Sequence, residues 1–347
     1  MAMNKFAFGL LLVVWFMFSC TDRSTGGAWD VDLMEVSADS LDYSLFVDSI
    51  RYIPLECTEE CMVGTVTDVA FAEDNIFVFD IKQQAVWVFS REGVYESCVS
   101  RQGNGPGEYV YISQFEYDKQ HGRIAVLASG QGQILYYSPR GEHLGTVNLS
   151  VKADDFKLTP QGDVILSCAG RDDASAGIYV TDAAGQNARP LVLRRENHRV
   201  YATFPWELCA YDDVVCFMAP NFENGVYHWE EGELSLAYPF RMLPEPGQDY
   251  EETVSLQHFG DFLRTTYLEG EKWILATYWS ADPAKDLRVF LYSKAEKRHW
   301  VGRNFRNDVD RRGVGIRTAY TDNNMLVTWE ENKDPDRNPV VGILQLK

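Results

Sequence analysis

The chain has 347 residues, of which 51 are Asp or Glu and 32 are Lys or Arg, so its formal net charge is −19 at pH 7. Such an acidic surface repels phosphate groups, and the sequence contains no basic stripe that would offset this repulsion. The composition therefore argues against nucleic-acid binding and against electrostatic docking on anionic lipids.

The first residues predict export from the cell. A short start with one positive charge, at Lys5, precedes an uncharged apolar run from Phe6 to Phe18. As a helix, a run of this length spans only about 20 Å, which is less than the roughly 30 Å of a bilayer core. We therefore interpret the run as part of a signal peptide and not as a membrane span.

The residues that end this run resemble the lipobox of bacterial lipoproteins. Ser19 precedes Cys20, and in that motif the chain is cut before the cysteine, whose thiol then carries the lipid. Phe18 departs from the strictest form of the motif, although it resembles the looser lipoboxes of the Bacteroidetes. We expect residues 1–19 to be a signal peptide, Cys20 to carry the anchor and residues 20–28 to form a flexible tether. The alternative is an ordinary secretory signal with an incidental cysteine.

This interpretation predicts the location of the protein. Buried lipid chains would supply the affinity for the membrane, because each buried methylene contributes about 0.8 kcal/mol. We expect a protein anchored in the bacterial cell envelope, with the outer membrane as the expected site. Whether it faces the periplasm or the cell surface stays open, since Asp22 is the only acidic residue among residues 21–27.

Six further cysteines follow Cys20. Cys57 and Cys61, and likewise Cys209 and Cys216, are close enough in sequence to pair in an oxidising compartment, and the alternative is that all six are free. The spacings include no C-x-x-C pair, so they predict no zinc site.

Beyond the tether, the chain consists of repeated units, each with two short strands and a tight turn. The first unit comprises Asp74–Asp80 and Val86–Gly93, and the second comprises His121–Leu127 and Gln133–Gly141. The turns in front of the central strands lie at Asn75, Gly122, Gly162, Asp213, Gly270 and Asn323. Strand-rich repeats of about 40 to 58 residues are typical of a β-propeller, in which each repeat forms one blade. The sequence therefore predicts an all-β, six-bladed β-propeller.

Glycines mark the tight turns within these units. We expect Gly93, Gly141, Gly162 and Gly232 to adopt the positive φ that such turns require.

The last unit is incomplete, because the chain ends at Lys347, one strand short of a four-stranded blade. The segment Trp29–Leu55 precedes the first unit and contains strand-like stretches such as Tyr43–Val47. We expect this N-terminal segment to complete the last blade and close the ring, so that no sheet edge stays free. Residues 29–347 would then form a single domain.

One loop connects the sequence to a known group of proteins. The run from Arg101 to Tyr109 reads RQGNGPGEY, and weaker matches lie at Tyr52–Glu56 and Asn338–Val341. With these segments the chain closely resembles the six-bladed β-propeller lipoproteins of Bacteroidetes, which are TolB-like or NHL-like propellers of unknown function. The resemblance covers essentially the whole mature chain and implies six blades, but it implies no chemistry. Its signature residues are Arg101, Gly103, Gly105, Pro106, Gly107, Glu108 and Tyr109.

We expect this signature loop (Arg101–Tyr109) to be mainly structural. It would carry the chain from the outer strand of the first blade to the inner strand of the second, with Arg101 and Glu108 paired across its neck and Tyr109 packed beneath. The start of the loop is similar to a dinucleotide-binding motif, but Glu108 stands where the third glycine belongs and no helix follows.

The sequence offers only weak catalytic candidates. Of the six histidines, only His258 lies near the expected start of an inner strand, where Arg264 and Tyr267 follow. These three residues are the candidates for a lyase or hydrolase acting from the central channel. A zinc site needs three or four converging ligands, and Asp334–Asn338 lacks the glycine and glutamate of a calcium loop. We therefore predict no metal and no cofactor.

The favoured function is a non-catalytic binding module of the cell envelope, whose ligand is a peptide, a glycan or another protein. Rigid propellers present variable loops at the mouth of a funnel, which suits such contacts. Trp206, Tyr278 and Trp279 are candidate contact residues, although their rings would equally suit packing between blades. The alternatives are the lyase or hydrolase described above and a structural subunit of an envelope complex.

Overall fold

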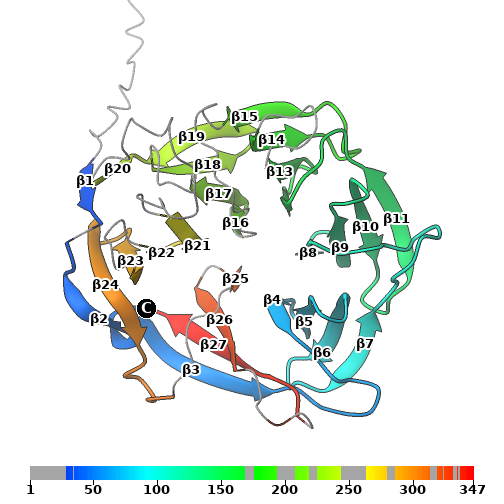
Figure 1. Ribbon diagram of the computed structural model, residues 1–347, viewed down its shortest axis with the longest axis horizontal. Helices are drawn as coiled ribbons and strands as arrows, with labels where there is room; N and C mark the ends of the chain where they lie inside the picture. Colours follow the sequence, from blue (N-terminus) through cyan, green and yellow to red (C-terminus); the bar gives the residue numbers. More distant parts are fainter. Residues whose placement is uncertain are drawn as a thin grey trace, which may run out of the picture.

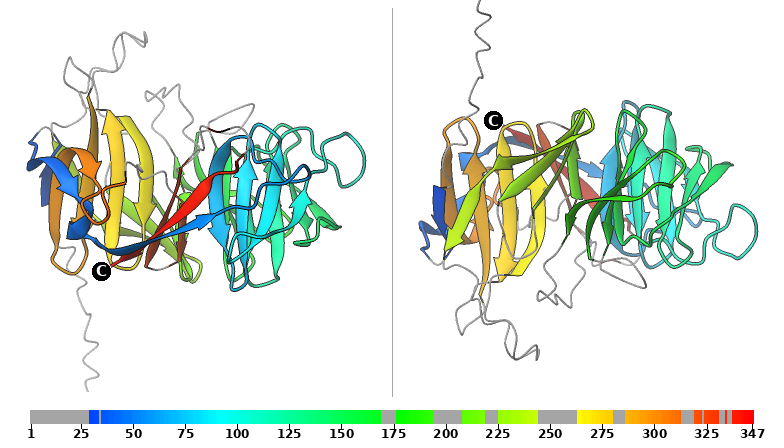
Figure 2. Two further views of the ribbon diagram at one scale, coloured as in Figure 1. Left: turned by 90° about the horizontal axis from the view of Figure 1, so that it is seen from below. Right: turned by 90° about the horizontal axis from the view of Figure 1, so that it is seen from above.

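The computed structural model describes residues 29–33, 35–168, 176–193, 208–218, 225–243, 263–279, 286–312, 319–322, 324–330, 334 and 337–347. Within them, six antiparallel sheets form a ring around a central channel, and each sheet is one blade of a β-propeller (Figure 1). Viewed from the side, the ring is a flat disc whose strands run between its two faces (Figure 2).

In each blade the strands follow one another from the channel to the rim. Blade 1 contains β4 (Val66–Phe71), β5 (Asn75–Asp80), β6 (Ala85–Ser90) and β7 (Tyr95–Val99). Blade 2 contains β8 (Gln114–Asp118), β9 (Arg123–Ala128), β10 (Gln133–Tyr137) and β11 (His143–Asn148). Blade 3 contains β12 (Asp155–Leu158), β13 (Val164–Cys168), β14 (Gly177–Thr181) and β15 (Arg189–Leu193).

The second half of the ring repeats this order with additions. Blade 4 contains β16 (Leu208–Tyr211), β17 (Val214–Met218), β18 (Val226–Glu230) and β19 (Glu233–Tyr238), and β20 (Phe240–Leu243) follows it. Blade 5 contains β21 (Leu263–Glu269), β22 (Trp273–Trp279), β23 (Leu287–Ser293) and β24 (Arg298–Arg306). Blade 6 contains β25 (Ala319–Asp322), β26 (Met325–Glu330) and β27 (Val340–Leu346).

The count of six blades is thus confirmed. Five of the predicted turn markers lie within the described residues, each just before or at the start of the second strand of its blade, and the sixth, Asn323, lies outside them. The glycines expected in tight turns have positive φ: 88° at Gly93, 81° at Gly141, 91° at Gly162 and 83° at Gly232. Blade count could be read from the sequence because each turn is a local feature.

Closure of the ring by the N-terminal segment is also confirmed. The strand β3 (Val47–Pro54) pairs antiparallel with β27, from Val47 opposite Leu346 to Pro54 opposite Val340. It becomes the outer strand of blade 6, and Figure 1 shows it lying along β27 at the rim. The last blade is therefore built from both ends of the chain.

One stretch of the N-terminal segment that was expected to be strand-like, Tyr43–Val47, differs from the prediction. Tyr43–Leu45 forms a short 3-10 helix, η1, and the strand begins only at Val47. Tyr43 and Phe46 are both buried, with ring centroids 5.8 Å apart, and both contact Phe305. Residues three apart point to opposite faces of a strand, whereas in a 3-10 turn they lie on the same side. Burial of both rings on one side favours the turn.

Two further N-terminal strands were not anticipated. The strand β1 (Trp29–Asp32) pairs in parallel with β20, and β2 (Ala38–Asp42) pairs in parallel with β24. Blade 5 thus has five strands, and β2 covers an edge that would otherwise be free.

The hydrophobic core lies between neighbouring blades. The second and third strands of blade 1 are almost wholly buried, because they contact blade 6 on one face and blade 2 on the other. Their sequences are therefore continuously apolar and do not alternate with polar residues. Between blades 1 and 2, for example, Phe77 stacks on Tyr117 with ring centroids 4.4 Å apart. Within the described residues, no helix has the length and apolar character needed to cross a membrane.

Candidate binding site in the central channel

The inner strands enclose a cavity of about 770 Å³. Its lining residues come from the innermost strands of blades 1 to 5 and from the turns that follow several of them. These strands face one another across the axis of the ring (Figure 1). We call this space the channel cavity, and its volume is typical of pockets for small ligands.

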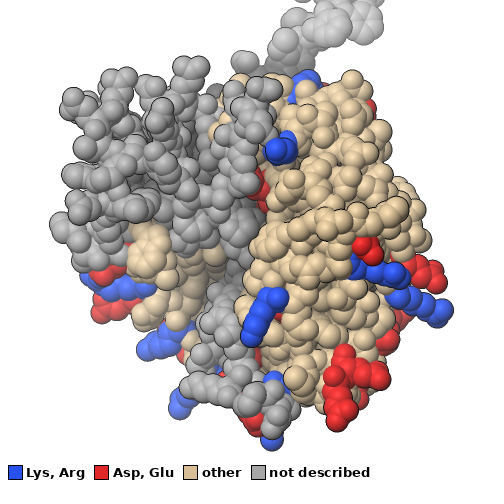
Figure 3. All heavy atoms as spheres, turned by 45° about the vertical axis from the view of Figure 1, so that its right-hand side comes forward, with Lys and Arg blue, Asp and Glu red and all other residues tan. Residues whose placement is uncertain are grey.

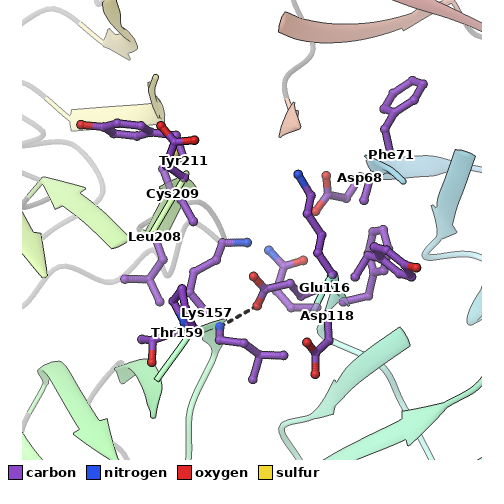
Figure 4. Close-up of a pocket in the computed structure, with 18 of the residues that line it drawn as sticks. Asp68, Phe71, Glu116, Asp118, Lys157, Thr159, Leu208, Cys209 and Tyr211 are labelled. Carbon is purple, nitrogen blue, oxygen red and sulfur yellow. Dashed lines mark hydrogen bonds between the residues drawn. The ribbon is translucent and has the colours of Figure 1, made fainter. Parts of the chain in front are cut away.

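Three charged side chains extend into the channel cavity from three successive blades. Asp68, Glu116 and Lys157 are each the third residue of their strand, β4, β8 and β12 respectively. Figure 4 shows the three side chains reaching from separate strands toward the same space. Each is half-buried, with protein around it and one side open to the cavity.

The two carboxyl groups hold protons more strongly than usual. Burial raises the pKa of Asp68 to about 7, although the charge of Lys157 and a hydrogen bond from the Val69 N–H (2.8 Å) act in the opposite direction. Burial likewise raises the pKa of Glu116, which accepts a hydrogen bond of 2.8 Å from the Leu158 N–H, drawn as the dashed line in Figure 4. Near neutral pH, Asp68 is therefore balanced between its charged and neutral forms.

Lys157 supplies a fixed positive charge beside these carboxyls. Burial alone would lower the pKa of its ammonium group, but the carboxyls of Glu116, Asp155 and Asp68 outweigh burial and raise it. The channel cavity thus presents a cation and two readily protonated acids within one partly enclosed space. Such a site can bind a ligand that carries groups of both signs.

The wall contributed by blades 4 and 5 contains Cys209, Tyr211 and Tyr267. Behind it, the fully buried Glu269 accepts hydrogen bonds from the Tyr267 hydroxyl and from His228 Nε2 (2.8 Å), and it pairs with Lys294 Nζ (2.5 Å). Burial alone would raise the pKa of Glu269, but the hydrogen bond from His228 and the charge of Lys294 hold it below its usual value. This carboxylate stays charged and joins blade 4 to blade 5.

The catalytic candidates from the sequence are only partly described. Tyr267 lines the channel cavity, and its hydroxyl is engaged by Glu269. Arg264 lies in β21, but its side chain is outside the described residues, and so is the whole of His258. Within the described residues, no three His, Cys, Asp or Glu side chains are grouped so that they could bind a metal ion.

The aromatic candidates do not meet at one site. Trp206 lies outside the described residues. Tyr278 is buried, and its hydroxyl donates a hydrogen bond of 2.9 Å to the carbonyl of Leu33. Trp279 ends β22 with 42% of its surface exposed, and neither residue lines the channel cavity.

The signature loop lies between the outer strand of blade 1 and the inner strand of blade 2, as expected. Tyr109 is fully buried beneath it, and its hydroxyl donates to the carbonyl of Gln84 (2.8 Å) and accepts from the N–H of Arg101 (2.9 Å). Two glycines are required by close contacts. A Cβ on Gly103 would meet the Glu108 carboxylate at 2.0 Å, and Gly107 has a φ of +74° with the His143 ring against it.

The predicted pair across the neck of this loop does not form. The Arg101 guanidinium instead donates to the carbonyl of Gly141 in blade 2, with its Nη2 atom 3.1 Å from that oxygen. Glu108 turns inward and accepts from the N–H of Gly105 at 2.8 Å. Arg101 therefore fastens the loop to the next blade, while Glu108 fixes its internal shape.

No disulfide joins any of the six described cysteines, which are all thiols in the structure. Cys209 and Cys216 stand directly opposite each other on β16 and β17. Cys20 and residues 1–19 lie outside the described residues.

Sequence reasoning missed the charged residues of the channel cavity. The signal was present, because Asp68, Glu116 and Lys157 each interrupt a short apolar or aromatic stretch in front of a central strand. Aligning the inner strands of the repeats would have placed all three at the same position. The presence of an Asp, a Glu and a Lys did not by itself indicate a site, because charged residues are abundant in this chain.

Solved structures of similar shape come from Bacteroides. A protein of Bacteroides fragilis thought to be exported has 14% sequence identity and a TM-score of 0.67, and the alignment covers 90% of this chain and all of the other. A member of the DUF4221 family from Bacteroides vulgatus has 10% identity and a TM-score of 0.54, and the alignment covers 87% of this chain and 97% of the other. At these identities the likeness shows the fold alone.

The sequence itself matches a described family. No curated protein is similar enough in sequence to count as a match. The match to the domain of unknown function DUF4934 extends over residues 30–344, which includes every blade. The chain therefore belongs to the DUF4934 family, and its six-bladed propeller agrees with the resemblance found in the sequence.

Proposed function

We propose that this protein is a non-catalytic binding module of the bacterial cell envelope, and that its ligand occupies the channel cavity. The observation that carries the proposal is the convergence of Asp68, Glu116 and Lys157 from three blades on a space of about 770 Å³. Burying charged side chains costs folding free energy, and a role in ligand binding would account for keeping them at this site.

The chemistry of the cavity favours a polar ligand with groups of both signs. Lys157 suits a carboxylate or another acceptor, while Asp68 and Glu116 suit an ammonium group or hydroxyls. Phe71 and Tyr211 add ring surface to the lining. A short peptide segment meets all these requirements, and a glycan or a loop of another protein meets most of them.

The location proposed with this function is the exported side of the membrane, through a lipid on Cys20. The apolar run that ends at Ser19-Cys20 supports it, and so does the likeness to a Bacteroides protein thought to be exported. Labelling cells with an alkyne fatty acid tests the anchor. The wild-type protein is expected to incorporate the label, and Cys20→Ser is expected to lose it.

Binding is tested by titrating the purified chain with peptide and oligosaccharide mixtures while following its thermal midpoint and heat of binding. A true ligand is expected to bind the wild type, and Lys157→Gln and Glu116→Gln are each expected to weaken it by about tenfold or more, which corresponds to roughly 1.4 kcal/mol. Lys297→Gln, an exposed lysine in a turn away from the cavity lining, serves as the matched control. Equal binding by all four proteins would place the ligand elsewhere.

Related measurements would identify either of two other functions. Turnover of a bound peptide or glycan, abolished by Tyr267→Phe, would favour a hydrolase or lyase. Recovery of a stable envelope complex that forms equally with Lys157→Gln would favour a structural subunit.

A further inference from the structure

Two thiols stand opposite each other in the wall of the channel cavity. Cys209 on β16 and Cys216 on β17 are directly paired in the antiparallel register. Residues paired in this way point to the same face of the sheet, with Cα atoms about 4.5–5.5 Å apart. Disulfides span Cα separations of about 4.4–6.8 Å, so this pair can be bridged without moving the strands.

The two sulfur atoms have different surroundings. Cys209 lines the channel cavity, where the ammonium of Lys157 is close enough to favour its thiolate. Cys216 is fully buried behind it, and its thiol donates a hydrogen bond to the carbonyl of Cys209 at 3.4 Å. Cys209 therefore borders the cavity with 5% of its surface exposed, whereas Cys216 is fully buried behind it.

The pKa values of the two thiols also differ, and they favour Cys209 as the more reactive one. The neighbouring Cys216 thiol, the hydrogen bond from the Glu269 N–H and the charge of Lys157 together lower the pKa of Cys209 despite its burial. Burial and the neighbouring Cys209 raise the pKa of Cys216 well above its usual value. A thiol of lowered pKa at the cavity wall, beside a fully buried partner, is the arrangement of an attacking and a resolving cysteine.

We propose that Cys209 and Cys216 form a redox-active dithiol, which small disulfides entering the channel cavity oxidise to an intramolecular disulfide. The Cys209 thiolate attacks one sulfur of the small disulfide, forming a mixed disulfide and releasing one thiolate. Cys216 then loses its proton to that thiolate and attacks Cys209 Sγ, which releases the second thiolate. One disulfide is formed and one is consumed, so two electrons pass from the protein to the small molecule.

Oxidation changes the joint between blades 4 and 5. In the reduced protein, Cys209 Sγ donates to the carbonyl of Glu269 (3.3 Å) and accepts from its N–H (3.4 Å). A disulfide removes the thiol proton, so the carbonyl of Glu269 loses that donor. Oxidation of the two cysteines therefore changes a hydrogen bond in the part of the cavity wall that contains Tyr267 and Tyr211.

The test uses the full mature chain, incubated with glutathione and glutathione disulfide at a series of ratios. The protein is then denatured in excess alkylating reagent, which blocks every thiol that is still reduced, and it is digested with chymotrypsin for analysis of the fragments by mass spectrometry. Cleavage after Tyr211 separates the two cysteines, so a disulfide is seen as two fragments that stay joined until reduced. We expect this joined pair in the wild type, and its formation to be reversed by excess reduced glutathione.

Single variants assign the two roles. Cys216→Ser is expected to accumulate the mixed disulfide of Cys209 with glutathione, because the resolving thiol is absent. Cys209→Ser is expected to leave Cys216 unmodified while the protein is folded. The circular dichroism of each variant shows whether it is folded.

Cys57 and Cys61 provide an internal control within the same molecule. They are not paired across two strands, and burial raises the pKa of Cys61 to about 12. We expect them to be alkylated at ratios where Cys209 and Cys216 are joined. The proposal is overturned if the folded wild type keeps both Cys209 and Cys216 reduced at every ratio, if they join only after denaturation, or if Cys57 and Cys61 join first.

Discussion

Charged residues at one position of successive inner strands shape the electrostatics of the channel. Asp68, Glu116 and Lys157 are each third in their strands, and ring closure brings them into one space. The effect of burial exceeds that of pairing at both carboxyls, so their pKa values rise although a lysine is close. These side chains are therefore sensitive to pH in a range where exposed carboxyls are not.

The first prediction concerns Asp68. Because its pKa is raised from 3.8 to about 7, the folded protein binds more protons than the unfolded chain between these values. The contribution of Asp68 to stability is therefore fully present below pH 4 and is lost as the pH rises through 7. Asp68→Asn is expected to be more stable than the wild type at pH 8 by about 1–2 kcal/mol, and this gain is expected to shrink toward pH 5.

Urea denaturation at the two pH values measures this difference. Asp39→Asn is the control, because the side chain of Asp39 is 97% exposed. A wild type that is more stable than Asp68→Asn at pH 8 would show that the charge of Lys157 outweighs burial at this site.

Tyr109 makes a second prediction at the scale of one residue. Its hydroxyl connects the carbonyl of Gln84 to the N–H of Arg101 in the buried interior beneath the signature loop. Tyr109→Phe leaves both groups without this partner, so we expect a loss of about 1–3 kcal/mol in the free energy of unfolding. Tyr111→Phe, whose ring is 48% exposed, is expected to change stability by less than about 0.5 kcal/mol. Equal midpoints for the two variants in urea would contradict the assignment.

At the scale of elements, the order of strands within a blade is local, but the closure of the ring is not. The four main strands of each of the first five blades are consecutive in the chain, and several of the described turns between them contain glycines with positive φ. Blade 6 instead takes its outer strand, β3, from the start of the domain. Without β3, the edge of β27 would be unpaired and open to other chains.

The third prediction tests this closure. A chain that begins at Glu56 lacks β1, β2, η1 and β3, and we expect it to aggregate or to lose cooperative unfolding. A chain that begins at Trp29 is the control and is expected to unfold like the mature protein. Adding a synthetic peptide of residues 47–55 to the shorter chain is expected to restore part of its stability. Cooperative unfolding of the shorter chain at the control midpoint would mean that β3 is dispensable.

At the scale of the whole molecule, charged side chains lie both on the surface and in the interior, at the junction of blades 4 and 5. On the surface, the described Lys and Arg side chains in Figure 3 lie singly or beside acidic ones and do not merge into one basic area. In the interior, Glu269 holds His228 and Lys294 together at the junction of blades 4 and 5. Exposed pairs contribute little, whereas breaking a buried pair leaves a charge without compensation.

The fourth prediction compares the loss of stability when a charge is removed from a buried ion pair and from an exposed one. Glu269→Gln removes the charge that Lys294 faces, and we expect a loss of about 3–5 kcal/mol in the free energy of unfolding. Asp42→Asn breaks the exposed pair with Arg306, whose guanidinium is 2.5 Å from the carboxylate, and is expected to lose no more than about 1 kcal/mol. Similar losses for the two variants, measured by urea denaturation at neutral pH, would show that the junction of blades 4 and 5 does not depend on Glu269.

The features that the sequence alone determined are local ones. Glycine turns such as Gly93 and Gly141, and apolar central strands such as Asn75–Asp80, specify hairpins without reference to the rest of the chain. Their repetition predicts six blades, and the shortage of one strand at Lys347 predicts closure by the N-terminus. Within that N-terminal segment, the expectation of a strand at Tyr43–Val47 was wrong, because burial of Tyr43 and Phe46 on one side favours a turn over a strand.

Only the tertiary structure decided which distant side chains meet. Arg101 could equally pair with Glu108 on its own loop, but the neighbouring blade presents the carbonyl of Gly141 to it. Lys157 acquires carboxyl neighbours, and Glu269 acquires His228 and Lys294, because the ring places separate blades in contact. The electrostatic energies of these groups depend on burial and on short distances between blades, and both exist only once the ring has closed.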